Sequence, residues 1–383
     1  MRILFWSGNF WPLIGGAEVL AGRLILALQK RGYEFVVLTS QRPVDCPTEG
    51  NYEGIPIYRV PFQDNIQNVE GLMELRQRIV EIKRRFAPDL IHLNDVHKHH
   101  FLHLITASMY PAPSLVTLHL ALSDQSTGRE SWLRQLLVKC DWVNCVSQTI
   151  LAETRRVVPD IAKRSSLIYN GLEDSTRVDE TLPMDPPQVL CLGRLQKRKG
   201  FDLALSAFAT IAHRHPQMRL IIAGDGPERL TLERQADELG LKHAVNFLGW
   251  VAPDEVRSLI NTATVVVMPS QNEGLPLVAL EAALMARPVV ATRIGGLSEV
   301  VMHRKTGLLV DPGDCAGMAE AISFLIQNPD KAAELGQTAR RRAQNEFSWQ
   351  RCVDGYDTLY QSIRQRAVHN PLRESSVDPT LRN

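Results

Sequence analysis

Residues 268–282 read Met-Pro-Ser-Gln-Asn-Glu-Gly-Leu-Pro-Leu-Val-Ala-Leu-Glu-Ala and carry the strongest fold signal in the chain. A valine-rich run ends at the start of this stretch, which predicts a buried strand. Pro276 stands where the following helix would begin, and proline suits that position because its missing N–H is not needed there. A strand, a polar loop and a helix in this order are typical of a parallel sheet covered by helices.

The same alternation extends along both halves of the chain. In the first half we expect strands at 2–6, 35–39, 89–93, 114–118, 142–146 and 166–169, and helices at 17–30, 70–86 and 148–158. In the second half we expect strands at 188–192, 219–223, 244–247, 264–268 and 288–291, and helices near 201–213, 228–239, 253–261, 276–286 and 314–327. The fold class is therefore α/β, with two doubly wound domains facing a central cleft, where ligands of such folds bind.

The chain of 383 residues exceeds the roughly 250–300 residues at which a single hydrophobic core usually splits. A polar, proline-containing segment between Gly171 and Gln188 is the best linker candidate. We therefore expect a first domain over 1–175 and a second over 188–345. The helix expected over 346–366 could pack back on the first domain, and residues 367–383 are expected to form a flexible tail.

The composition excludes some classes of partner. A formal charge of +1, with 44% hydrophobic and 22% charged residues, gives no overall attraction to nucleic acid. The six cysteines lack a C-x-x-C pair, which predicts idle thiols in a reducing compartment. The apolar run at 2–6 is too short for a signal-peptide core, and no run of about 18 apolar residues occurs. We expect a cytoplasmic protein, with the basic stretch 76–86 as the candidate for peripheral contact with anionic lipid at the inner membrane face.

The loop and helix start within 268–282 predict an anion site between two carboxylates. Backbone N–H groups of Gly274 and Leu275 would point from the positive end of a helix, which binds diphosphate without a metal. Glu273 and Glu281 flank that site, and each carboxylate can accept hydrogen bonds from two neighbouring hydroxyls. The alternative is that Glu273 caps the helix and Glu281 lies on a solvated face.

A second anion-binding loop is expected at 193–200, directly after the first strand of the second half. Four cations lie within six residues, which is often plain surface charge, but their place at the carboxyl end of a strand favours anion binding. Arg194 and Lys199 are our candidates for the diphosphate, because they can stabilise a leaving group. Lys197 and Arg198 are interpreted as solvated neighbours.

Three glycines and a histidine complete the candidates. Gly224 and Gly226 let a backbone approach a nucleotide, although this pattern falls short of the full dinucleotide fingerprint. Gly16 precedes a helix, so it serves either as a turn or as a phosphate contact. His119 ends a predicted strand, where a parallel sheet delivers functional side chains. The histidines at 97–100 lack acidic or cysteine partners at a recognisable spacing, so no metal site is expected.

These residues resemble the motifs of the retaining glycosyltransferases of family four, which have the GT-B fold of two Rossmann-like domains. The resemblance rests on Gly15-Gly16-Ala17-Glu18, Gly193-Arg194, Lys199-Gly200 and the acid pair Glu273 and Glu281 in an E-x7-E pattern. It implies that the first domain serves the acceptor and the second binds most of the donor. By this resemblance Glu273 contacts hydroxyls of the donor sugar, Glu281 the ribose, Arg194 and Lys199 the diphosphate, Gly16 a phosphate, His119 the transferred sugar, and Trp250-Val251 the nucleobase.

The resemblance implies a hexosyltransferase that moves a sugar from a nucleoside diphosphate sugar, UDP- or GDP-linked, to a hydroxyl of a glycan, glycolipid or small molecule. It further implies retention by front-face substitution, with no cofactor and no metal, and no D-x-D motif occurs in the sequence. Two other functions stay open: a nucleotide-sugar epimerase of the same layout, and a non-catalytic subunit that binds nucleotide sugars. The sugar, the acceptor and the oligomeric state are not specified, and acceptor choice is expected to depend on loops near 41–68 and 120–130.

Overall fold

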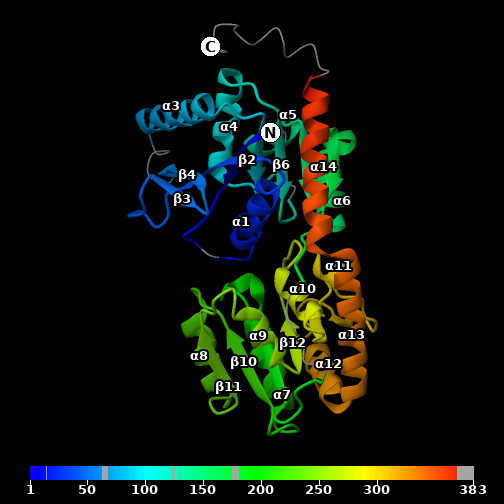
Figure 1. Ribbon diagram of the computed structural model, residues 1–383. Helices are drawn as coiled ribbons and strands as arrows, with labels where there is room; N and C mark the ends of the chain where they lie inside the picture. Colours follow the sequence, from blue (N-terminus) through cyan, green and yellow to red (C-terminus); the bar gives the residue numbers. More distant parts are fainter. Residues whose placement is uncertain (14, 63–67, 123–125, 129, 175–180, 369–383) are drawn as a thin grey trace. The chain divides into compact units, whose positions relative to one another are not determined.

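The computed structural model describes residues 1–13, 15–62, 68–122, 126–128, 130–174 and 181–368 (Figure 1). It divides into two compact units, one formed by Met1–Ile168 with Cys352–Asn383 and the other by Tyr169–Arg351. The division at Ile168 lies inside the range 1–175 that the sequence suggested for the first domain. The centre of the predicted linker (175–180) and the predicted tail from 369 onward lie outside the described residues.

The sheet of the first unit has the order β3-β4-β2-β1-β5-β6-β7-β8, and its neighbouring strands are parallel except β3 with β4. The run from Ile3 to Trp6 in β1 is fully buried, as expected for a central strand covered on both faces. The strands are β1 (Arg2–Ser7), β2 (Glu34–Ser40), β3 (Glu49–Tyr52), β4 (Ile55–Val60), β5 (Leu90–Asn94), β6 (Ser114–Leu118), β7 (Trp142–Cys145) and β8 (Ser165–Leu167). The helices are α1 (Gly16–Gln29), α3 (Val69–Phe86), η1 (Lys98–His100), α4 (Phe101–Thr106), η2 (Ala107–Met109), α5 (Trp132–Lys139), α6 (Gln148–Val157), η3 (Pro159–Arg164) and α14 (Trp349–Val368).

A β-hairpin occupies part of the region 41–68 that the sequence predicted as loop. β3 and β4 pair antiparallel, with Asn51 opposite Pro56, and β4 continues the sheet beside β2. The prediction was wrong because β3 is almost wholly exposed and so has no hydrophobic alternation to detect. The buried Arg59 at the end of β4 donates to the carbonyl oxygens of Pro47 and Trp11, both at 3.1 Å. Residues 63–67 lie outside the described part.

Helix α3 contains the basic stretch that suggested lipid contact, and its exposed face is electrically mixed. The exposed charged residues are Glu70, Glu74, Arg78, Glu81, Arg84 and Arg85. Lys83, which the sequence pattern counted among the surface cations, is fully buried. Arg76 is half-buried and adds one further cation, so the accessible charge of the helix is nearly balanced, and lipid contact through α3 stays a prediction. In the portion that the structure describes, no helix has the length and apolar character needed to span a bilayer.

The C-terminal helix α14 runs alongside the sheet of the first unit (Figure 1). Buried polar side chains join the helix to the sheet. His92 on β5 lies 2.7 Å from the hydroxyl of Tyr360 through Nδ1 and 2.8 Å from Thr117 through Nε2. Burial lowers the pKa of His92 to about 3, so the ring is neutral at physiological pH. Asn144 donates to the hydroxyl of Tyr356 at 3.3 Å. These hydrogen bonds fix the register of α14, because each buried polar atom needs its partner.

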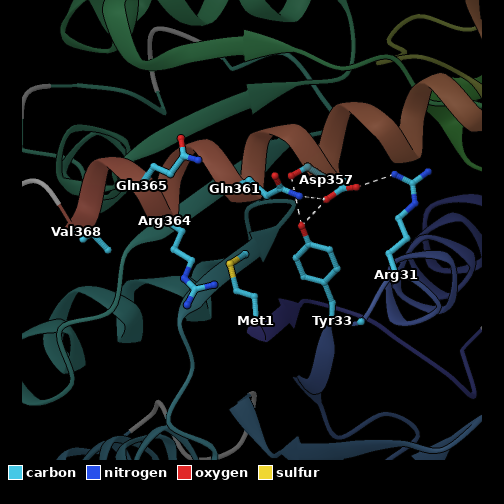
Figure 2. A pocket seen from close by; sticks show the side chains of 9 residues that line it. Met1, Arg31, Tyr33, Asp357, Gln361, Arg364, Gln365 and Val368 are labelled. Atoms are coloured by element: carbon cyan, nitrogen blue, oxygen red, sulfur yellow. Dashed lines mark hydrogen bonds and ion pairs between the residues drawn. The ribbon is translucent and has the colours of Figure 1, made fainter.

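A groove of about 590 Å³ lies between α14 and the turn before β2 (Figure 2). Asp357 on α14 accepts hydrogen bonds from Arg31 (2.8 Å), Tyr33 (2.5 Å) and Gln361 (2.8 Å). Burial raises the pKa of Asp357, but these donors outweigh burial and leave the pKa below its ordinary value. The groove lies at the amino end of β2, whereas ligands of doubly wound sheets bind at the carboxyl ends. We therefore interpret Asp357 and its partners as an anchor for α14.

The second unit contains a fully parallel sheet of order β11-β10-β9-β12-β13-β14. The chain moves outward from β9 through β10 and then in the other direction from β12, so the switch point lies between β9 and β12. The strands are β9 (Gln188–Leu192), β10 (Arg219–Ala223), β11 (Val245–Gly249), β12 (Val265–Met268), β13 (Val289–Thr292) and β14 (Gly307–Val310). The helices are η4 (Lys197–Lys199), α7 (Phe201–Ala212), α8 (Arg229–Glu238), α9 (Val256–Asn261), α10 (Leu277–Leu284), α11 (Leu297–Val300), α12 (Cys315–Gln327) and α13 (Pro329–Glu346). Two doubly wound units confirm the predicted α/β fold class.

Candidate active site

The switch point of the second unit brings together the two loops that hold most of the predicted site. The amide of Gln271, after β12, donates to the carbonyl oxygen of Arg198, after β9, at 2.8 Å. Gly200 has a φ of +68°, and a Cβ at this position would lie 2.2 Å from the carbonyl oxygen of Pro269. Only glycine satisfies both conditions, so the two loops can pack against each other. Their side chains are therefore held at a fixed spacing.

Lys199 and Glu273 meet between these loops. Nζ of Lys199 lies 2.5 Å from Oε1 of Glu273, and the hydroxyl of Ser270 donates to the same oxygen at 2.8 Å. Among the described residues, the other oxygen, Oε2, has only the Arg198 guanidinium nearby, at 4.0 Å, which is beyond hydrogen-bond distance. Glu273 is 6% exposed, and a buried carboxylate needs such charged and hydrogen-bonding partners. One oxygen is thus saturated, and the other can accept from a ligand.

The turn after β13 supports Glu273 from another side. The amide of Gly296 donates to the carbonyl oxygen of Glu273 at 3.4 Å. A Cβ on Gly296 would lie 1.5 Å from the carbonyl oxygen of Gly274, and one on Gly295 would lie 2.5 Å from that of Glu273. Both glycines therefore permit a close backbone approach. Sequence reasoning missed them, although a Gly-Gly pair after a predicted strand is a known turn signal.

Helix α10 starts beside this carboxylate. It begins at Leu277, and Pro276 is its N-cap with a ψ of 125°. The sequence placed Pro276 at the first helical position, which was wrong by one residue because an extended ψ lies outside the helix. In the described part of the chain, the amides of the buried Gly274 and Leu275 have no hydrogen-bond acceptor. Unsatisfied N–H groups at a helix start are what an anion site requires. Glu281 lies within α10, half-buried.

The basic loop separates into cations of different kinds. Arg194 is exposed, and its side chain has no partner within the described residues. Lys197 pairs with Asp202 at 2.9 Å and is exposed, in keeping with a solvated side chain. Arg198 is also exposed, in keeping with its interpretation as a solvated neighbour, and its guanidinium donates to the carbonyl oxygen of Asn272 at 3.4 Å. Arg194 and Lys199 are therefore the cations of this loop that a ligand could engage.

The predicted glycines after β10 pack against the loop after β9. A Cβ on Gly224 would lie 1.9 Å from the carbonyl oxygen of Gly193, and one on Gly226 would lie 2.5 Å from that of Leu195. Their φ values of +138° and +154° also exclude most side chains. Packing between loops is thus a sufficient reason for both glycines, whether or not a nucleotide also contacts them.

Trp250 and Val251 follow β11, the edge strand beside β10. The amide of Gly224 donates to the carbonyl oxygen of Gly249 at 2.7 Å, so this segment is joined to the glycine loop. Trp250 is 60% exposed and Val251 is half-buried. An indole left in solvent at this edge is available to a ligand.

In the first unit, His119 and Gly16 lie after strands β6 and β1. His119 Nε2 is 3.0 Å from Oδ1 of Asn94, and because an amide oxygen only accepts, Nε2 carries the proton and Nδ1 is the acceptor. Burial lowers the pKa of His119 despite the attraction of Asp95, so the ring is neutral near pH 7. Gly16 is the first residue of α1, and its N-cap Gly15 has no side chain that could bond the free amides.

Three histidines of the 97–103 cluster, His99, His100 and His103, are packed inside the first unit. His99 stacks on Phe62 at 4.1 Å between ring centroids, and His100 and His103 pack edge-on against Trp6. Among the residues that the structure describes, no three His, Cys, Asp or Glu side chains form a group that could hold a metal ion. Burial lowers the pKa of His99 to about 3.

Comparisons with known proteins agree with this geometry. The family model for group 1 glycosyl transferases matches residues 173–342, and the model for glycosyltransferase family 4 matches residues 14–176. Glycogen synthase of Mycobacterium tuberculosis is 30% identical over 95% of each chain. D-inositol 3-phosphate glycosyltransferase of Corynebacterium urealyticum is 40% identical, over 50% of this chain and 46% of its own.

Solved structures share the fold. Sucrose-phosphate synthase from Thermosynechococcus elongatus superposes with a TM-score of 0.81 at 24% identity, covering 94% of this chain and 98% of its own. HepE of Anabaena, in complex with UDP and glucose, gives 0.76 at 22% identity, covering 98% and 100%. The predicted family and fold are thereby confirmed. The chain belongs to the group 1 glycosyl transferases of family 4, with the GT-B fold, and is a glycosyltransferase.

Proposed function

We propose that this enzyme transfers a hexosyl residue from a nucleoside diphosphate sugar to a hydroxyl acceptor with retention of configuration. The contact between Lys199 and Glu273 at the switch point carries this proposal. It sets a cation suited to a diphosphate beside a carboxylate whose second oxygen can accept from a sugar hydroxyl. The related HepE structures, described with UDP and with UDP-glucose, support a nucleotide-sugar donor. The donor we propose is a UDP- or GDP-sugar.

Each side chain of the second unit then has a distinct task. Arg194, Lys199 and the free amides at the start of α10 hold the diphosphate, because all three present positive charge or N–H groups. Oε2 of Glu273 accepts from the sugar, and Glu281 accepts from the ribose. We propose that Val251 contacts the nucleobase. Gly224 and Gly226 would let the main chain approach the nucleotide closely.

Two residues of the first unit also receive proposed roles. Gly16 starts α1 after β1, where free amides can contact a phosphate. His119 lies after β6, at the carboxyl edge of its sheet, and we assign it to the transferred sugar. Since its Nε2 donates to Asn94, Nδ1 of the neutral ring is the atom that could accept from a hydroxyl.

The proposed chemistry is a front-face substitution. The bond between the anomeric carbon and the diphosphate oxygen breaks, and the acceptor oxygen bonds to the same face of that carbon. The departing phosphate oxygen takes the acceptor's proton. Arg194, Lys199 and the α10 start stabilise the negative charge that develops on the leaving group. Positive charge from the chain itself leads us to propose that no metal or cofactor is needed.

The cellular setting is also a proposal. We infer a cytoplasmic enzyme of polysaccharide or glycolipid synthesis, in keeping with relatives named glycogen synthase and D-inositol 3-phosphate glycosyltransferase. The mixed charge on α3 favours no membrane attachment through that helix. If the enzyme transferred sugar to acceptors in vesicles and to no soluble acceptor, that result would contradict a role on soluble glycans.

A thermal-shift screen of UDP-, GDP- and ADP-sugars tests the donor class first. A ligand at 100 times its dissociation constant stabilises the fold by about 2.7 kcal/mol. Turnover of the donor that binds is then measured for Arg194→Ala and Lys199→Ala, each expected to lose roughly 10- to 100-fold through a charge-assisted contact. Lys197→Ala is the matched control, because this cation of the same loop pairs with Asp202 and should retain normal turnover.

The same experiments separate the competing functions. Chelator that leaves turnover unchanged supports the metal-free proposal, and a loss restored by a divalent cation would overturn it. A new sugar isomer formed from donor alone would identify an epimerase. Donor binding without transfer across a broad acceptor panel would identify a binding subunit. Normal turnover in both Arg194→Ala and Lys199→Ala would contradict the proposed diphosphate site.

A further inference from the structure

We infer that Ser270 is a positioning residue for donor-sugar recognition, acting through Glu273, and this inference rests on the function proposed above. Ser270 is 2% exposed and its hydroxyl donates to Oε1 of Glu273 at 2.8 Å. Its side chain is buried and its single hydroxyl hydrogen is engaged by Oε1, so it has no hydrogen to donate to a sugar in this arrangement. Its effect on a ligand must therefore pass through the carboxylate.

Ser270 is itself fixed by the sheet. The hydroxyl of Thr292, at the end of β13, donates to the carbonyl oxygen of Ser270 at 2.5 Å. Thr292 is 1% exposed and belongs to a strand that pairs with both β12 and β14. The serine hydroxyl is thus presented from a rigid element, and a carboxylate bonded to it has little freedom to rotate.

The two partners of Oε1 differ in what donor binding would do to them. Lys199 is an ammonium with three N–H donors on a flexible stem, and the proposed function draws it toward the diphosphate. The Ser270 hydroxyl has one hydrogen and no such competing ligand. We therefore expect Ser270 to keep Oε1 engaged when Lys199 turns to the phosphates, leaving Oε2 directed at the sugar.

This division predicts a selective defect. Ser270→Ala frees the Glu273 carboxylate to rotate, which weakens the contact with sugar hydroxyls while the diphosphate contacts remain. If the serine served only to satisfy a buried carboxylate, its replacement would instead weaken the binding of diphosphate and conjugate alike, or would lower only the stability of the fold. The contrast between a nucleoside diphosphate and its sugar conjugate separates these roles, because only the conjugate engages Glu273.

The test measures dissociation constants of UDP, GDP, UDP-glucose and GDP-mannose by calorimetry, with the full chain. For the pair that wild type binds, Ser270→Ala should weaken the sugar conjugate about 10-fold and the free diphosphate less than twofold. Ser270→Thr, which keeps a hydroxyl, should restore the conjugate to within about threefold of wild type. Ser323→Ala is the control and should leave both dissociation constants unchanged. It also removes a buried serine hydroxyl of the second unit, but one that lies in α12 and is hydrogen-bonded to His215.

A double variant completes the test. With Glu273→Ala present, adding Ser270→Ala should change conjugate binding less than twofold, since the group it orients is gone. Equal weakening of diphosphate and conjugate in Ser270→Ala, or full additivity in the double variant, would overturn the positioning role while leaving the proposed function intact. If wild type binds none of the four compounds, the donor proposal fails, and the inference that rests on it fails too.

Discussion

Lys83 is the buried ionisable residue whose replacement should change the pH dependence of stability most clearly. It is fully buried near the end of α3, and its Nζ donates to the hydroxyl of Thr106 at 2.7 Å. Burial lowers its pKa from 10.5 to about 7, because a charged ammonium is poorly solvated there. Lys83→Met removes the amine and keeps much of the apolar stem. Thr106 remains bonded, since its hydroxyl donates to the carbonyl oxygen of Leu102 at 2.7 Å.

The magnitude follows from proton linkage. Between pH 7 and pH 10.5 the unfolded chain holds the Lys83 proton and the folded chain has largely released it, so the free energy of unfolding rises with pH. The contribution from pH 7 to pH 9 is about 2 kcal/mol, at 1.36 kcal/mol for each full proton and pH unit. Below about pH 6 both states are protonated and the contribution is flat. Lys83→Met should lose this rise.

Urea unfolding of the full chain, followed by circular dichroism at pH 7, 8 and 9, provides the assay. The quantity compared is the free energy of unfolding of wild type minus that of Lys83→Met, which cancels other titrating groups. It should grow by about 2 kcal/mol from pH 7 to pH 9. Lys139→Met, which removes an exposed lysine on α5, should show no such growth. If the difference between wild type and Lys83→Met stayed constant within about 0.5 kcal/mol from pH 7 to pH 9, the conclusion that Lys83 is buried and largely neutral would be refuted.

Four further substitutions probe the packing, of which Gly240→Ala serves as the control for Gly224→Ala. Gly224→Ala should lower the free energy of unfolding by about 3 kcal/mol, because its Cβ meets a backbone carbonyl oxygen, whereas Gly240→Ala, with open space at a φ of +72°, should lose only about 1–2 kcal/mol in the same urea assay. Tyr360→Phe leaves Nδ1 of His92 without its partner and should cost about 1–3 kcal/mol, seen as a lower urea midpoint with an unchanged slope. Burial lowers the pKa of His99 to about 3, so wild type loses stability as the pH falls below 6.5. His99→Phe should remove about 2 kcal/mol of that loss between pH 6.5 and pH 4.5. Equal acid sensitivity of both proteins would contradict this expectation.

The fold and much of the site could be predicted from sequence because parallel sheets impose both. Buried strands such as β12, a run of valines ending at Met268, are visible without any partner strand. Loops at the carboxyl ends of neighbouring strands must converge, so the proximity of the loops that carry Lys199 and Glu273 could be predicted by placing each loop after its strand. The ion pair between the two side chains was not predicted and is seen only in the structure. The regular topology therefore predicts which loops meet, while the ligand roles of their residues stay a proposal.

Other features were missed because they depend on contacts distant in sequence. The exposed β3 has no alternation, and its pairing with β4 becomes apparent only when the sheet is assembled. Lys83 has the charge of a surface residue, and only the packing of α3 against Thr106 on α4 shows that it is buried. Ser270 lies within the best-recognised stretch, yet its hydroxyl acquires a role only through the orientation of Glu273.

The most direct measurement is a crystal structure of the enzyme with the UDP- or GDP-sugar that most stabilises it. We predict Oε2 of Glu273 within hydrogen-bond distance of a sugar hydroxyl, and Lys199 and Arg194 at the diphosphate in front of α10. Ser270 should still donate to Oε1. A donor bound with its diphosphate away from Lys199 and the α10 start, or with Glu273 contacting no part of the sugar, would contradict the proposed site.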